Sequence, residues 1–163
     1  LEGCKDNHIN YYLGVIEERR GHREAAAAYF EKAGAGTGEP AGMMYYNDQP
    51  ADMIYYQGLA CEKQNRAAGA KARFNKLLDY GEQHIYDDMR VSYFAVSLPD
   101  FLIFDDDLNK RNQAHCHYLI GLANLGLGNR SAAADALRSA IALEPAHQDA
   151  IRYLLRAENG EIF

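Results

Sequence analysis

The chain has no tryptophan, three cysteines, four prolines and no excess of basic residues. An odd number of cysteines without CxxC spacing predicts neither a disulfide framework nor a zinc site, so Cys4, Cys61 and Cys116 are expected to be reduced. The formal net charge of −6 leaves no general excess of positive charge for nucleic acid or an anionic membrane. Neither is an expected partner.

Motifs that carry chemistry are also lacking. The sequence has no nucleophile elbow, phosphate loop or paired-carboxylate motif, so catalysis is not expected and no cofactor is predicted. In His115-Cys116-His117, neighbouring helical side chains point about 100° apart, whereas helical metal ligands need a spacing of three or four residues. Asp105 to Asp107 lacks the glycine and spacing of a calcium loop and is expected to cap a helix. No metal site is therefore predicted.

Targeting segments are equally scarce. There is no signal peptide and no apolar run of about 18 residues. The sequence opens on Leu1-Glu2-Gly3 and reaches a helical pattern within a few residues, as a fragment of a longer protein would. A cytoplasmic location is the expectation, and it depends on that parent protein.

What the sequence does contain is a ladder of small residues between 115 and 145. Gly121 and Ala133 stand where two antiparallel helices would cross, and their minimal side chains allow the backbones to approach closely. Gly128 is expected at the turn between the helices. Pro145 closes the unit because proline cannot continue a helix. The stretch therefore predicts a helical hairpin.

The same ladder occurs twice more upstream. Gly14, Gly21, Ala26 and Phe30 reproduce the spacing of Gly121, Gly128, Ala133 and Leu137, and the spacing returns at Gly58, Asn65, Ala70 and Phe74. This order of residues resembles the tetratricopeptide repeat. The intervals between the key glycines exceed the roughly 34 residues of an uninterrupted array by about ten and about 29 residues, which indicates two insertions.

The predicted fold is all-α. We expect one domain spanning residues 1–163, a right-handed α-solenoid of three tetratricopeptide-like hairpins with a long insertion and a C-terminal capping helix. The expected boundaries are repeats at about 7–40, 51–86 and 114–147, the insertion at 87–112 and the capping helix at 147–157.

The long insertion is rich in large apolar residues. Full burial of each is worth roughly 1.5 to 3 kcal/mol, so the segment is expected to dock on the solenoid or on a partner. The contact residues expected from it are Phe94, Leu98, Phe101 and Phe104.

A concave binding strip is predicted from the first helix of each unit. A tyrosine stands three residues before each key glycine, which would give an aromatic ladder suited to an extended peptide or a sugar face. The same tyrosines could instead fill the joints between repeats. The predicted strip consists of His8, Tyr11, Val15, Asp52, Tyr55, Leu59, His115, Tyr118 and Leu122. Tetratricopeptide domains that clamp a chaperone's C-terminal carboxylate carry lysine, arginine and asparagine here, so binding of such a tail is not expected.

Three further stretches carry a narrower resemblance. They are Glu39 to Pro50, Tyr80 to His84, and Tyr93 through Asn112. Together they resemble the C-terminal repeat region of large bacterial proteins of unknown function whose N-terminal portions look like sugar-processing enzymes.

The resemblance implies an accessory module. The function expected first is a non-catalytic protein-protein interaction scaffold that binds a protein or peptide, the N-terminal part of its own parent chain, or a second copy in a homodimer. The alternative is a carbohydrate-binding or structural appendage of a carbohydrate-active enzyme.

Overall fold

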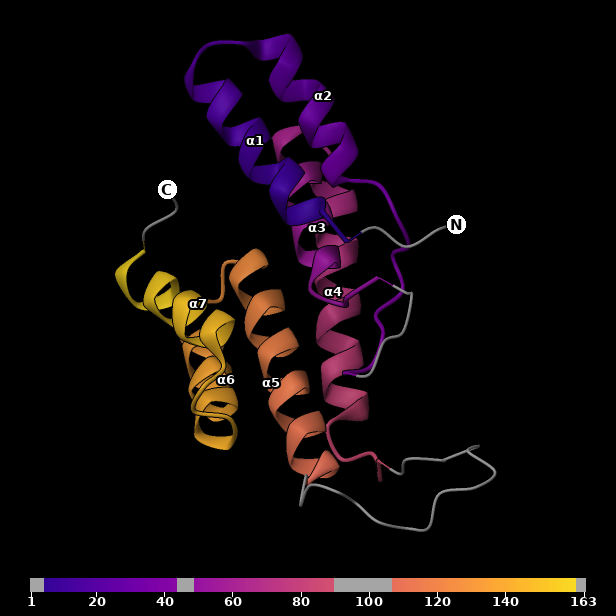
Figure 1. Ribbon diagram of the computed structural model, residues 1–163, viewed down its shortest axis with the longest axis vertical. Coiled ribbons are helices and arrows are strands. Elements are labelled where there is room, and N and C mark those ends of the chain that lie inside the picture. The colour runs from indigo at the N-terminus through magenta and orange to yellow at the C-terminus, as the bar shows by residue number, and fades with distance from the viewer. Residues whose placement is uncertain (1–4, 44–48, 90–106, 161–163) are drawn as a thin grey trace, which may run out of the picture.

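The computed structural model describes residues 5–43, 49–89 and 107–160, and every regular element in these ranges is an α-helix (Figure 1). The all-α prediction is confirmed for this part of the chain. The expected insertion contacts Phe94, Leu98, Phe101 and Phe104 lie outside the described residues. The helices are α1 (Asn7–Arg19), α2 (Arg23–Ala33), α3 (Met53–Lys63), α4 (Ala67–His84), α5 (Leu108–Gly126), α6 (Arg130–Leu143) and α7 (Gln148–Asn159).

Three helix pairs, α1 with α2, α3 with α4, and α5 with α6, are joined by turns of one kind. Gly21 and Gly128 have φ angles of 81° and 82°, and Asn65 at the equivalent place has a φ of 58°. Glycine adopts this left-handed conformation without strain, and asparagine tolerates it better than most residues. The three positions predicted as hinges therefore share one backbone conformation.

The key glycines lie where the paired helices cross. A Cβ atom on Gly58 would stand 2.3 Å from the ring of Phe74, and one on Gly121 would stand 2.6 Å from Leu137. Gly14 has the same relationship to Phe30, at 2.6 Å. The predicted role of these glycines is confirmed, because each leaves the space that a large residue of the partner helix fills.

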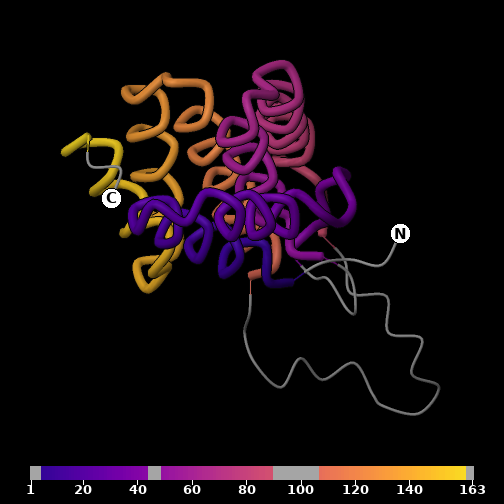
Figure 2. The backbone as a smooth tube through the Cα atoms, turned by 90° about the horizontal axis from the view of Figure 1, so that it is seen from above, coloured from indigo at the N-terminus to yellow at the C-terminus, as the bar shows by residue number. Residues whose placement is uncertain are grey.

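Successive pairs pack into two layers. In the inner layer α1 contacts α3, α3 contacts α5 and α5 contacts α7, while α2, α4 and α6 form the outer layer. Figure 2 shows α1 and α2 lying across the near end of the stack, with α7 to one side. Phe74 of α4 also fills the space beside Gly126 of α5, so one ring joins two helix pairs.

The glycine-rich segment after α2 is held by side-chain amides. Nδ2 of Asn7 and Nε2 of Gln57 donate to the carbonyl oxygen of Ala35 at 2.8 and 2.9 Å. Gln49 and Gln57 both donate to the carbonyl oxygen of Thr37, at 2.8 and 2.9 Å. The described part of this segment therefore packs on the helices, and the amides satisfy backbone acceptors that no regular element engages.

One predicted helix start is confirmed, and one predicted helix end is shifted. The Asp107 carboxylate accepts a hydrogen bond of 3.0 Å from the backbone N–H of Lys110, as a side chain at a helix start does. Helix α5 therefore includes residues 108–112, which the sequence assigned to the insertion. Helix α7 spans Gln148–Asn159 and is capped by Gly160, whose φ is 71°, so the capping helix begins one residue later and ends two residues later than predicted.

Candidate functional site

The prediction of an open aromatic ladder needs correction. Tyr11, Tyr55 and Tyr118 are only 6%, 3% and 5% exposed. Nearly all of their surface is therefore covered, in agreement with the alternative that these rings fill the joints between repeats. The physical reason is that a tyrosine ring at a helix crossing gains more by contact with neighbouring rings than by facing water.

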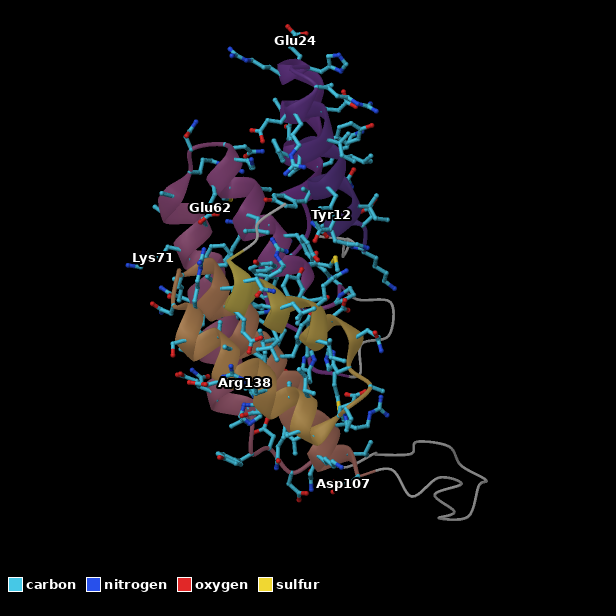
Figure 3. The ribbon with its side chains drawn as sticks, turned by 90° about the vertical axis from the view of Figure 1, so that its left-hand side faces the viewer. Tyr12, Glu24, Glu62, Lys71, Asp107 and Arg138 are labelled. Carbon is cyan, nitrogen blue, oxygen red and sulfur yellow. The ribbon has the colours of Figure 1, made fainter. Side chains whose placement is uncertain are left out.

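Helix α7 supplies the cover over these rings. Tyr153 is fully buried, and its hydroxyl forms a hydrogen bond with the hydroxyl of Tyr56. The Tyr153 ring centre lies 5.5 Å from that of Tyr55 and 6.3 Å from that of Tyr118. Figure 3 shows α7 running across the face that also carries Tyr12. Helix α7 thus reaches the second helix pair through Tyr153.

The rings form one group that draws on α1, α3, α5 and α7, and all of them are buried except that of Tyr12, which is half-buried. We call this group the tyrosine cluster, and its members are Tyr11, Tyr12, Tyr55, Tyr56, Tyr118 and Tyr153. Burial raises the pKa of Tyr11 to about 12 and raises the pKa of Tyr55 and Tyr118 further. Their hydroxyls are protonated at neutral pH, so these groups serve as hydrogen-bonding and packing groups and not as bases.

Four more residues of the predicted strip also belong to the packed interior. Leu122 is fully buried, and Val15 and Leu59 are partly buried against the core. The Nε2 atom of His115 lies 3.3 Å from the carbonyl oxygen of Ala41, and burial lowers the pKa of this imidazole to about 4. His115 therefore ties the glycine-rich segment to α5 as a neutral group.

His8 and Asp52, the two remaining residues, line an open hollow of about 370 Å³. It lies where the N-terminal ends of α1, α3 and α7 meet, and we call it the N-terminal pocket. The structure brings His8 and Asp52 together there but separates them from the other predicted residues. The pocket is lined by Lys5, His8, Pro50, Asp52, Met53, Tyr56, Asp149 and Arg152.

The charged side chains that line the N-terminal pocket are two carboxylates, Asp52 and Asp149, and two cations, Lys5 and Arg152. Asp149 and Arg152 form an ion pair of 2.9 Å within α7. Asp52 is half-buried, and no ion pair within the described ranges includes it. Burial and the Asp149 carboxylate together raise the pKa of Asp52. The positive N-terminal ends of α3 and α7 would lower the pKa of a carboxyl group here. Burial and the Asp149 carboxylate raise the pKa of Asp52 by more than that.

The floor of the pocket is rigid and apolar. Met53 and Tyr56 are 5% and 2% exposed. The Nδ1 atom of His8 lies 3.4 Å from the sulfur of Met53, and its ring centre is 5.8 Å from that of Tyr56. Pro50 adds a further fixed wall. The arrangement can therefore hold an aliphatic group below a carboxylate.

Sequence reasoning missed Tyr56, Tyr153, Asp149 and Arg152. One signal could have found the second of these: the typical repeat length of about 34 residues, applied once more beyond the third repeat, brings Tyr153 to the register position of Tyr56 and Tyr12. The acid pair had no such signal, because Asp52 and Asp149 begin helices that are distant in the sequence. Their proximity depends on the curvature of the inner layer.

Two searches within the described parts of the chain bear on other classes of site. Across residues 5–43, 49–89 and 107–160, no three histidine, cysteine, aspartate or glutamate side chains converge as a metal site would need. Over the same ranges, no helix combines the length and apolarity required to cross a membrane. A comparison with protein-family models found none that matches the chain.

Proposed function

We propose that this chain is a non-catalytic interaction module of the tetratricopeptide type, a right-handed solenoid that binds a peptide segment of a partner protein or of its own longer polypeptide. The N-terminal pocket is the binding site in this proposal. The observation that carries it is that three helices distant in the sequence converge on one open hollow while the tyrosine cluster is closed. The recurrence of the same glycine contact in three helix pairs supports the repeat assignment.

A peptide suits the N-terminal pocket because the hollow offers both apolar walls and hydrogen-bonding groups. Most of the lining residues are charged or polar, among them Asp52 and Arg152, and Pro50 and Met53 add apolar surface. Such a site can hydrogen-bond a peptide and also contact an aliphatic side chain. Five rings of the tyrosine cluster, in contrast, are at most 6% exposed and leave little face on which a sugar ring could stack, while Tyr12 is half-buried.

The test is a selection from a phage-displayed library of random 12-residue peptides. Arg152→Glu reverses a charge at the pocket, and Arg138→Glu reverses one at a similarly exposed position of the outer layer. The two side chains are 51% and 55% exposed. We expect selected peptides to bind the native chain and Arg138→Glu equally. Their affinity for Arg152→Glu should differ about tenfold from that for the native chain, because the reversed charge lies at the pocket and leaves Asp149 without its ion-pair partner.

Circular dichroism must first show that both variants retain their helices. Peptides that bind the two variants alike would contradict the proposal. Failure to enrich any peptide on the native chain would contradict it too.

A further inference from the structure

The charges of the N-terminal pocket point to the kind of side chain that it binds. Arg152 already neutralises Asp149 at 2.9 Å, whereas no ion pair within the described residues involves Asp52. The charges that act on Asp52 are those of Asp149, His8 and His147, and Lys5 lines the same pocket. A half-buried carboxylate beside a second carboxylate is stabilised most by a ligand that brings positive charge.

The walls of the pocket specify what should carry that charge. Pro50, Met53 and Tyr56 are the apolar lining residues, and Pro50 is the most exposed of the three. A lysine side chain places its aliphatic stem along apolar surface and keeps its ammonium at a polar edge. The thioether of Met53 adapts well to such a flexible stem.

A guanidinium group fits this arrangement less well than an ammonium group. The planar fork of arginine is best matched by two parallel acceptors, whereas an ammonium is a compact point charge that one carboxylate satisfies. Asp149, the second carboxylate, is already held by Arg152. An anionic ligand would meet the unpaired charge of Asp52.

We propose, resting on the proposed function, that the N-terminal pocket binds a lysine side chain of a peptide partner, with the ammonium against Asp52 and the stem along Pro50 and Met53. The net charge of −6 favours a basic partner over the whole surface as well. The pocket would thus prefer a cationic ligand, whereas tetratricopeptide domains that clamp a chaperone's C-terminal carboxylate prefer an anionic one.

The experiment uses three capped glycine-rich octapeptides that carry two lysines, two Nε-acetyl-lysines or two glutamates. Binding is followed by NMR through the backbone signals of Asp52, Tyr56 and Asp149. Asp52→Asn removes the charge with little change in shape, and Asp79→Asn is the control at an exposed position of α4. We expect the lysine peptide alone to shift these signals, with affinity reduced about tenfold or more by Asp52→Asn and unchanged by Asp79→Asn.

The other outcomes separate the two proposals. Equal binding of the acetylated or glutamate peptide at these signals would overturn the lysine inference and leave peptide binding standing. No response to any octapeptide, while phage-selected peptides still bind the pocket, would have the same meaning. If phage selection also fails, the proposed function falls with it. If n-butylammonium binds as tightly as the lysine peptide, the peptide backbone adds nothing to binding, and the proposal that the lysine belongs to a peptide partner would be overturned.

Discussion

The hydroxyl groups of Tyr56 and Tyr153 meet in a hydrogen bond that joins α3 to α7 across 97 residues of sequence. Both rings are almost fully buried, at 2% and 0% exposure. This contact fixes the last helix over the inner layer, and it divides that layer into the closed tyrosine cluster and the open N-terminal pocket.

The hydrogen bond between these tyrosines should be measurable as a coupling energy. We expect Tyr56→Phe and Tyr153→Phe each to lower the free energy of unfolding by about 1 kcal/mol or more, since each leaves a buried hydroxyl with one partner fewer. The double variant should lose less than the sum of the two, by about 0.5 to 1.5 kcal/mol. Urea unfolding of all four proteins gives these values. Strict additivity would contradict the contact.

A second prediction concerns the helix crossings. Gly58→Ala should lower the free energy of unfolding by about 1 to 3 kcal/mol, because the added methyl group would stand 2.3 Å from Phe74. The matched control is Gly69→Ala on α4, where the nearest neighbour, the sulfur of Cys61, is 3.5 Å away. That change should stabilise the chain by up to about 1 kcal/mol through helix propensity. Similar effects at both sites would refute the packing.

The unpaired carboxylate gives a third prediction. The raised pKa of Asp52 means that its protonated form stabilises the fold below its ordinary pKa, and that this stabilisation is lost as pH rises through the folded-state pKa. At pH 7 the ionised group therefore opposes folding, and Asp52→Asn should raise the melting temperature by up to about 4 °C. The facing groups His8, His147 and Asp149 remain in the variant.

Thermal unfolding between pH 3 and pH 8 measures this effect. The gain in the Asp52→Asn variant should disappear at the acidic end, where Asp52 is protonated in both states. A variant that is less stable than the native chain at pH 7 would show that Asp52 stabilises the fold instead.

A fourth prediction has the opposite sign. His115 has a pKa lowered to about 4, so the unfolded chain binds a proton that the folded chain refuses between pH 4 and about 6.5. The free energy of unfolding should therefore decrease by up to about 3 kcal/mol as the pH is lowered through this window, at about 1.4 kcal/mol for each unit of pKa difference. His115→Gln keeps a donor for the carbonyl of Ala41 and should flatten the decline. Part of the decline should remain in this variant, because burial also lowers the pKa of His117.

The helix pairs could be predicted from the sequence because their determinants are local. Glycine at the crossing, a left-handed residue at the turn and a large residue on the return helix recur at fixed spacing, and each acts within one pair. The contact of Gly58 with Phe74 follows from that spacing alone. Asp107 as the start of α5 was predictable for the same reason.

The site could not be predicted in the same way. Tyr11, Tyr55 and Tyr118 do share a position in their helices, but whether that position faces solvent depends on α7. The path of α7 depends on how far the inner layer curves, which is the sum of small rotations between pairs. The pocket that unites Asp52 with Asp149 is set by the same curvature.

One measurement tests the division of the inner layer most directly. It maps a phage-selected peptide on the native chain by NMR, using backbone signals from every helix. The account predicts shifts confined to the pocket residues Lys5, His8, Asp52, Asp149 and Arg152. Shifts centred on the outer helices α2, α4 and α6 would contradict it, as would a peptide that displaces Tyr153 and opens the tyrosine cluster.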